Sequence, residues 1–400
     1  MNATRYPVVV LGAGICGTAL AYHLTRRGVG PVLVYDPRTP AAGATGRAAG
    51  IVTEQLWDHW DVLVTRESHR EYADLASRWD PTAYLQNGFV RWTRDPVVEP
   101  FVWETLQRLK SWGVEVEEAT PSDLARWLPQ GRFEDVRAAI VGRHDACVTP
   151  SAIATIYAEG ARQAGATFDF GQSMESVSAL SEGGYLLRTG GREFRADQLV
   201  VAAGAWSKRL LIELGHPIPL TPYRTQAALL RPPTLPADPF PSGHDIDLDV
   251  YVRPEGPDRI LGGNGTERTE ANPDNFQTGG DERFITHLAE SLTQRFPGWA
   301  DSELISSWAG VCSSTFDRRP LVGPVPNAEG LFVTAGYNGF GVMRAGGAMR
   351  RLADLIAEGP DSDAAREALR PVWPGRFPEH LPDFPPRPGF TLEGGDTPRF

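Results

Sequence analysis

Three glycines near the N-terminus, Gly12, Gly14 and Gly17, follow a short apolar run and precede a stretch of helical character. In this spacing the first glycine allows a tight turn, the second lets a pyrophosphate approach the backbone, and the third lets helix and strand pack closely. The phosphates would lie at the positive end of the helix dipole. Asp36 ends the next apolar run, where a carboxylate can accept both ribose hydroxyls of an adenosine. The pattern predicts a dinucleotide site, and a glycine-rich turn without a ligand is the alternative.

The elements around this motif form a strand–helix–strand unit. Val8–Leu11 and Val32–Asp36 are typical of buried parallel strands, and Thr18–Arg27 has the character of a helix. A domain for NAD would continue this alternation through the first half of the chain, whereas the texture becomes mixed after residue 80. Glycine-containing segments that follow buried strands return at Leu199–Gly204 and Leu331–Gly341. Ligand-facing glycines from such distant segments favour a long, extended dinucleotide such as FAD over NAD.

The rest of the chain mixes both kinds of element. Residues 166–201 have the character of a meander with glycine pairs at its turns. Helices are predicted at 101–112, 150–164, 281–295 and 345–356, and strands at 88–92, 226–230, 250–253, 259–261 and 331–333. This mixture predicts an α/β protein.

Composition and charge exclude several classes of protein. The 400 residues exceed what one hydrophobic core usually fills, so two domains are expected. Hydrophobic residues make up 41% and charged residues 22%, which is ordinary for a globular chain. The net charge of −11 argues against binding of nucleic acid or an anionic membrane. No apolar run is long enough to span a membrane, no secretory signal is evident, and we expect a cytoplasmic protein. The three cysteines show no metal-ligand spacing, so no metal site is predicted.

Four stretches of sequence together resemble one superfamily. They are VVVLGAGICGTALAYHL with the later YDP, AAGATGRAAGIV, ADQLVVAAGAWSKRLLIELG, and the terminal pair WAGVCSSTFDRRPLVGPVP and LFVTAGYNGFGVMRAGGA, with YVRPEG as a weaker fifth match. The chain is similar to the FAD-dependent amine oxidoreductases that include D-amino-acid oxidase, glycine oxidase and sarcosine oxidase. The similarity extends from residue 8 to about residue 356, which is nearly the whole chain.

The resemblance implies a particular α/β architecture. A Rossmann-like FAD-binding domain of the glutathione-reductase topology would be discontinuous and would alternate with a substrate domain built on an antiparallel sheet. We expect residues 1–87, 147–220 and 305–372 to form the FAD-binding domain, residues 88–146 and 221–304 the substrate domain, and residues 373–400 a proline-rich C-terminal tail. The flavin would lie between the two domains.

The resemblance also implies which residues contact FAD. Ala44–Gly50 would approach the pyrophosphate and the isoalloxazine, and the backbone of Met174 would bind the adenine. A helix N-terminus at Gly339–Met343 would face the pyrimidine end of the flavin, where its partial positive charge favours the reduced, anionic state. The full expected set is Gly12, Gly14, Ile15, Cys16, Gly17, Asp36, Pro37, Arg38, Ala44, Thr45, Arg47, Ala49, Gly50, Ile51, Met174, Ala203, Gly204, Trp206, Cys312, Gly339, Phe340, Gly341, Val342 and Met343.

The substrate side departs from the superfamily pattern. Tyr251 stands where amino-acid oxidases place a tyrosine that touches the substrate carboxylate. The arginines that grip this carboxylate would fall at Cys312 and Gly339, and the lysine of sarcosine oxidases near Met343, and all three are replaced. Two alternatives remain open. Another arginine (Arg47, Arg253 or Arg344) supplies the counter-charge, or the substrate is larger and less acidic.

Two further positions concern the flavin itself. Some members bond a cysteine covalently to the flavin, and that cysteine falls at Gly310, two residues before Cys312. We expect non-covalent FAD, with a covalent link to Cys312 as the alternative. Members that react fast with dioxygen hold a lysine where this chain has Leu261. The electron acceptor could therefore be dioxygen or another acceptor, such as a quinone or a protein.

The functional hypothesis is an FAD-dependent amine oxidase or dehydrogenase. A neutral small-molecule amine would give a hydride from its α-carbon to flavin N5, and the imine would be hydrolysed in water. Tyr251, Arg253, Tyr337 and Asn338 are the candidates for orienting the substrate. The alternatives are an FAD-dependent dehydrogenase of a hydroxy acid, a flavin monooxygenase, or a non-catalytic flavoprotein subunit, and the chain could be a monomer or a homo-oligomer.

Overall fold

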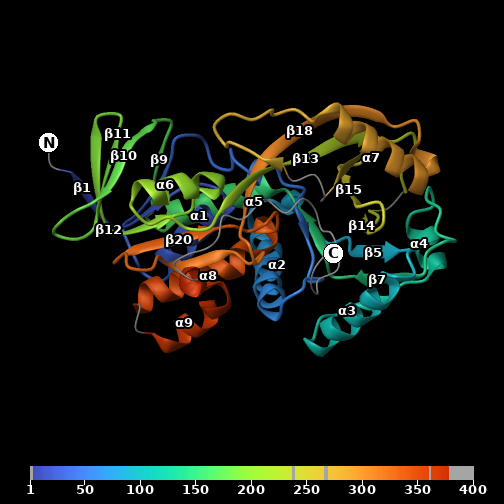
Figure 1. The fold of residues 1–400 in the computed structure, drawn as a ribbon, viewed down its shortest axis with the longest axis horizontal. Helices are drawn as coiled ribbons and strands as arrows, with labels where there is room; N and C mark the ends of the chain where they lie inside the picture. Colours follow the sequence, from blue (N-terminus) through green and yellow to red (C-terminus); the bar gives the residue numbers. More distant parts are fainter. Residues whose placement is uncertain (1–2, 237–238, 265–268, 360–361, 378–400) are drawn as a thin grey trace.

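The computed structural model describes residues 3–236, 239–264, 269–359 and 362–377. Its first sheet has eight strands (Figure 1). The parallel centre runs in the order β20–β12–β1–β2–β9, and antiparallel strands β10, β11 and β19 extend it. The bounds are β1 (Thr4–Leu11), β2 (Val32–Asp36), β9 (Thr167–Phe170), β10 (Met174–Ala179), β11 (Tyr185–Thr189), β12 (Arg192–Val201), β19 (Leu321–Pro324) and β20 (Leu331–Ala335).

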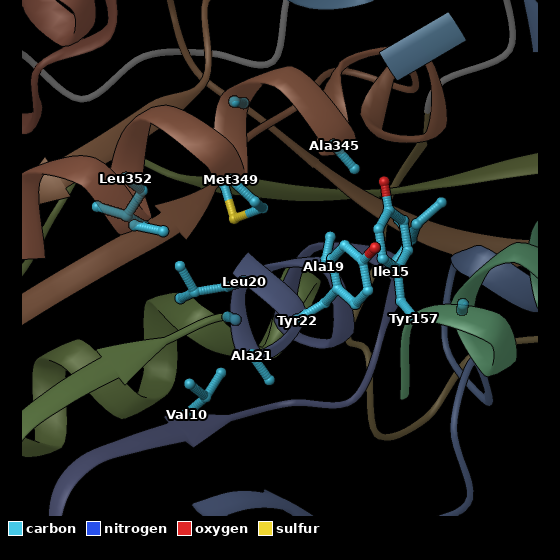
Figure 2. Close-up of a cluster of buried hydrophobic side chains, with 14 of the residues drawn as sticks. Val10, Ile15, Ala19, Leu20, Ala21, Tyr22, Tyr157, Ala345, Met349 and Leu352 are labelled. Carbon is cyan, nitrogen blue, oxygen red and sulfur yellow. The ribbon is translucent and has the colours of Figure 1, made fainter. Parts of the chain in front are cut away.

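Both faces of the first sheet are covered, which explains why its central strands are continuous apolar runs. One face bears a core with helices α1 (Ile15–Arg26), α2 (His59–Trp79), α5 (Pro150–Gln163) and α8 (Gly341–Glu358), and α9 (Asp363–Leu369) packs against α8. Figure 2 shows Leu20 and Ala21 of α1 between Val10 of β1 and the α8 residues Met349 and Leu352. The opposite face packs against α6 (Ser207–Glu213).

The second sheet has nine strands and lies beside the first along the long axis of the molecule (Figure 1). Its order is β17–β13–β16–β15–β14–β5–β7–β6, and β18 pairs with β13. One face packs against α4 (Pro121–Trp127) and α7 (Glu282–Arg295), and α3 (Glu99–Ser111) contributes to a neighbouring core. The bounds are β5 (Phe89–Thr93), β6 (Glu117–Glu118), β7 (Ala138–Gly142), β13 (Thr221–Arg231), β14 (Ser242–Asp245), β15 (Val250–Glu255), β16 (Arg259–Asn264), β17 (Thr269–Glu270) and β18 (Glu303–Ser314).

A small third sheet joins the segments that pass between the two large sheets. It consists of β3 (Ile51–Val52), β8 (Ala146–Val148) and β4 (Tyr84–Leu85), with β8 in the centre. Short 3₁₀ helices occur at Thr45–Arg47, Pro81–Ala83, Gly204–Trp206, Pro297–Trp299, Arg370–Val372 and Pro374–Arg376.

The mixed α/β fold with two large sheets is confirmed, and several details differ from expectation. Helix α2, with 21 residues, was not predicted. Helix α8 begins at Gly341, four residues before the predicted start, because glycine and small side chains weaken its sequence signal. The second sheet is antiparallel except for one parallel pair, β5 and β14. Strand β18 pairs along its length with β13, so the segment from 305 to 314, which we assigned to the first domain, lies in the second sheet. Of the expected 373–400 tail, residues 378–400 lie outside the described residues.

Candidate functional site

The glycine turn between β1 and α1 is shaped by close backbone contacts. Gly12 has φ +115°, and a Cβ there would lie 2.5 Å from the carbonyl oxygen of Ala202. A Cβ on Gly17 would collide with the carbonyl oxygen of Gly12, so this glycine allows the helix to sit against the turn. Gly14, the N-cap residue of α1, has no side chain that could cap the helix. The Thr45 hydroxyl instead accepts a hydrogen bond from the backbone N–H of Ile15 (3.1 Å). The helix N-terminus is thus held close to the segment that contains Thr45.

Asp36 ends β2 and links two parts of this turn. Its Oδ2 accepts a hydrogen bond from the backbone N–H of Ala13, and its Oδ1 accepts one from the backbone N–H of Arg38, both at 2.9 Å. Burial raises the pKa of the Asp36 carboxyl, and these two N–H groups oppose the rise. Each carboxylate oxygen still has a lone pair for a further donor, as binding of ribose hydroxyls would require.

The segment from Ala41 to Ile51 forms a compact turn beside α1. The Arg47 guanidinium donates hydrogen bonds to the carbonyl oxygens of Ala42 (2.6 Å) and Gly43 (3.2 Å). Gly50 has φ +74°, and a Cβ there would collide with the carbonyl oxygen of Val148. Arg47 therefore stabilises its own turn, although its side chain also borders the cavity described below.

A second helix N-terminus faces the same space. Helix α8 begins after Phe340 with no capping side chain. The preceding Asn338 has φ +60°, and its backbone N–H donates to the carbonyl oxygen of Ser313 (2.9 Å). The Tyr337 hydroxyl is hydrogen bonded to the Thr334 hydroxyl (2.8 Å) and lies beside Cys16, whose pKa burial raises to about 12. The turn before α8 is thus joined to β18 and approaches the glycine turn.

The second sheet supplies the opposite wall. Arg91 of β5 is paired with His244 of β14, and His244 is paired with Tyr251 of β15, so these three residues share one row across the sheet. Tyr251 is paired in turn with Gly263 of β16, where a Cβ would collide with the Tyr251 hydroxyl. All three side chains of the row line the cavity, whereas Val90 and Trp92 belong to the core on the other face.

These walls enclose a single continuous cavity of about 990 Å³. It extends from Asp36 and Trp206 at one end to the row of Arg91, His244 and Tyr251 at the other. The expected cofactor residues that line it are Gly12, Gly14, Ile15, Cys16, Asp36, Pro37, Arg38, Ala44, Thr45, Arg47, Ala49, Gly50, Ile51, Met174, Ala203, Gly204, Trp206, Cys312, Gly339, Phe340, Gly341, Val342 and Met343. Gly17 does not reach the cavity and acts by packing.

The four candidates for orienting the substrate are placed differently. Tyr251, Tyr337 and Asn338 line the cavity. Arg253 lies outside the lining, donates to the carbonyl oxygen of Pro254 (2.9 Å) and pairs with Glu255 (2.5 Å). Burial raises the pKa of Tyr251 above its usual range, although the charge of Arg253 opposes the rise, so the hydroxyl remains a hydrogen-bond donor. Arg344, another arginine considered from the sequence, is fully buried in an ion pair with Asp61 (2.8 Å).

Sequence reasoning missed Arg91, His244 and Asp249. The side chain of Arg91 is buried in a five-residue strand that is otherwise apolar except for Thr93. A buried arginine within such a strand is costly to desolvate, and this cost is the signal that could have identified it. His244 and Asp249 both line the cavity, with 3.6 Å between Nε2 and Oδ1. They flank the turn between β14 and β15, and no local pattern marks them.

The sequence is similar to a known protein family and to proteins of known activity. The sequence model of the DAO family, described as FAD dependent oxidoreductase, matches residues 7–355. Human mitochondrial dimethylglycine dehydrogenase is 24% identical over 89% of this chain and 43% of its own length. The chain thus spans under half the length of that relative. Glycine oxidase from Geobacillus kaustophilus is 25% identical over 88% of this chain and 93% of its own length.

Solved structures show the same fold. The glycine oxidase structure from Geobacillus kaustophilus superposes with a TM-score of 0.82 at 22% identity, covering 94% of this chain and 100% of that chain. L-proline dehydrogenase from P. horikoshii superposes with a TM-score of 0.83 at 22% identity, covering 91% of this chain and 96% of that chain. Among the described residues, no helix has both the length and the apolar character of a membrane span.

Proposed function

The chain belongs to the DAO family of FAD-dependent oxidoreductases, and from this premise we propose that it oxidises a carbon–nitrogen bond of a small amine to an imine, which water then hydrolyses. The observation that carries the proposal is the continuity of the cavity. One space of about 990 Å³ connects the turn between β1 and α1 with the row that contains Tyr251. A cofactor extended along this space would present its reactive end to a substrate held against the second sheet.

The residues of the cavity fit FAD. Gly12 keeps the turn packed against the carbonyl oxygen of Ala202, and Gly14, which lines the cavity without a side chain, would let a diphosphate approach the backbone. The N-cap residues of α1 and α8 make no side-chain hydrogen bond, and Thr45 occupies only the backbone N–H of Ile15, so further backbone N–H groups remain at these two positive helix ends. Asp36 offers carboxylate oxygens for ribose hydroxyls at the far end. We propose that the α1 end holds the diphosphate and the α8 end faces the flavin, with no covalent bond to the protein.

FAD, when bound, supplies a two-electron acceptor for a hydride from the carbon next to the amine nitrogen. The contribution of the chain is orientation and exclusion of water. The neutral Tyr251 hydroxyl can donate a hydrogen bond to the substrate from the wall opposite α8. The adjacent His244, with Asp249 beside it, can take the proton that an ammonium group must lose before oxidation. The positive end of α8 favours negative charge on the cofactor.

The relatives support an amine substrate by their names. Human dimethylglycine dehydrogenase and Geobacillus kaustophilus glycine oxidase are named for amino-acid substrates. One is named a dehydrogenase and the other an oxidase, so their names do not select the electron acceptor. Leu261 stands where fast oxidases of the superfamily hold a lysine. We propose that an acceptor other than dioxygen takes the electrons from the cofactor.

The test is anaerobic reduction of the purified yellow protein. We expect the flavin absorbance to bleach with at least one secondary or tertiary amine and to recover slowly in air but fast with a quinone acceptor. A flavin that responds to hydroxy acids instead indicates the hydroxy-acid dehydrogenase. Consumption of NAD(P)H indicates a monooxygenase. A flavin that no amine in a broad panel bleaches indicates a non-catalytic subunit, and a protein that binds no flavin contradicts the whole proposal.

A further inference from the structure

We propose that Arg91 binds the carboxylate of the substrate, so that the amine oxidised here is an amino acid. This inference deepens the proposed function and depends on it for the identity of the reaction. The arginine positions that serve this purpose elsewhere in the superfamily are Cys312 and Gly339 in this chain. The anchor would instead come from β5, in the part of the second sheet that precedes Tyr251 by about 160 residues.

The first support is where Arg91 lies. It faces the cavity in the same row as His244 and Tyr251, two strand spacings from Tyr251, which is about 10 Å between backbones. The residue is only 5% exposed. Its guanidinium lies over the Phe89 ring, with the carbon atom Cζ 5.3 Å from the ring centre, and this contact holds the side chain against the wall.

The second support is the charge of the wall. Burial lowers the pKa of Arg91 to about 10, which leaves the guanidinium charged at neutral pH. A desolvated guanidinium binds a carboxylate through two parallel hydrogen bonds. Asp249 lies at the same cavity beside His244. The same wall therefore carries a positive group, Arg91, and a negative group, Asp249, with His244 paired to the first and close to the second, and this matches the two charges of an amino-acid zwitterion.

The third support is the placement of the other arginines. Of the described residues that line the cavity, the arginines are Arg38, Arg47, Arg91 and Arg209. Arg38 lies over the Trp206 ring, at the end of the cavity opposite Tyr251. Arg209 lies at this end too and pairs with Asp274. Arg47 donates to carbonyl oxygens of its own turn. Of these four arginines, Arg91 is the one that lies in the second sheet, as Tyr251 does.

The experiment uses two readouts on the FAD-loaded protein. The first is binding without turnover: propionate is titrated and the perturbation of the flavin spectrum gives its Kd, with inorganic phosphate at equal concentrations as a second anion. The second is anaerobic flavin reduction by sarcosine and by the matched amine without a carboxylate, N-methylethylamine. We expect propionate to bind, phosphate to bind at least about 10-fold more weakly, and only sarcosine-type amines to reduce the flavin efficiently.

The variants are Arg91→Gln and Arg91→Lys, with Arg94→Gln, directly after the same strand, as the matched control. Arg94 lies outside the cavity lining and forms ion pairs with Asp135 and Asp247. We expect the Kd of propionate to rise about 100-fold in Arg91→Gln and about 10-fold in Arg91→Lys, with a change under about 3-fold in Arg94→Gln. Reduction by N-methylethylamine should change little in any variant.

The outcomes separate the inference from the proposed function. If propionate does not perturb the wild-type flavin, if phosphate binds more tightly, or if Arg91→Gln with its flavin intact binds propionate as the wild type does, the inference is wrong. If Arg91→Gln loses its flavin, an unchanged Kd in Arg91→Lys overturns it equally. Efficient reduction by the amine without a carboxylate overturns it while the proposed function survives. Binding of propionate through Arg91 with no reduction by any amine overturns the proposed function alone.

Discussion

The ring of Tyr251 lies over Gly263 on the neighbouring strand, so that a Cβ on Gly263 would collide with the tyrosine hydroxyl and with the ring carbon Cζ. Glycine at this position gives the Tyr251 side chain the space from which it faces the cavity. The sheet thereby fixes where the hydroxyl can donate a hydrogen bond.

Gly263→Ala should therefore displace the tyrosine and lower kcat/KM for the amine by about 100-fold, since misplacement of a group by about 1 Å can cost this much. Tyr251→Phe should lower kcat/KM by about 10-fold through loss of one hydrogen bond. Steady-state kinetics with measured flavin content provide the check. Gly262→Ala is the control, because its Cβ would point to the other face and meet Leu288 of α7 at 3.2 Å. Wild-type turnover in Tyr251→Phe would remove this residue from the substrate site.

Asp36 should determine how firmly FAD is held. Asp36→Ala removes the acceptor of the backbone N–H groups of Ala13 and Arg38 together with the proposed ribose contact. We expect the Kd of FAD, measured by fluorescence during reconstitution of the apoprotein, to rise at least about 10-fold. Asp36→Asn, which keeps one acceptor, should lie between. The control is Asp197→Asn, which removes an exposed ion pair with Arg5 on the same sheet. Full flavin content in Asp36→Ala would contradict the proposed orientation of the dinucleotide.

The part of the site around Asp36 could be predicted because it is local. A strand, a glycine turn, a helix and a second strand follow one another within about 30 residues, and the small side chains needed at Gly12 and Gly17 are visible in the sequence. The 41–51 turn and the start of α8 could be located only through the superfamily resemblance. Their contact with the glycine turn depends on the packing of helices that are distant in sequence.

The wall around Tyr251 could not be predicted in the same way. Arg91 and His244 become neighbours through a parallel strand pair whose members are about 150 residues apart, and a shift of one residue in register would turn either side chain to the other face. Helix α2 was missed for a different reason. Its buried face includes polar residues such as Thr65, Ser68 and Glu71, which mask the apolar period of a helix.

Substitution of Cys312 tests whether the flavin is covalently attached to the protein. It lines the cavity on β18, and a Cβ on Gly310, where attaching cysteines of the superfamily fall, would meet the Arg47 side chain at 3.2 Å. We expect acid precipitation to release the flavin into the supernatant from the wild type and from Cys312→Ser alike. Cys147→Ser is the control, since the Cys147 thiol is hydrogen bonded to Ser242. Yellow colour retained in the wild-type pellet and lost from that of Cys312→Ser would establish the covalent bond instead.

Asp145 should make the stability of the protein depend on pH above the acid range. Its carboxyl is buried, and burial raises its pKa to about 7, against hydrogen bonds from the Thr53 hydroxyl, the backbone N–H of Glu54 and the Gln55 amide, which lower it. In the unfolded chain an aspartate has a pKa of about 3.9. The folded protein therefore binds this proton more tightly, and the stability that results is fully present below about pH 4 and lost as the pH rises through 7.

Asp145→Asn removes this titration, so the free energy of unfolding of the wild type relative to the variant should fall by on the order of 3 kcal/mol between pH 4 and pH 7.5. Urea unfolding at several pH values measures this difference, in which groups common to both proteins cancel. Asp123→Asn is an exposed control whose carboxyl has a lowered pKa, so its effect should be flat over most of this range. A difference for Asp145→Asn that stays constant or rises with pH would mean that the three hydrogen-bond donors outweigh burial. In that case Asp145 would be a permanent negative charge that stabilises the buried guanidinium of Arg91.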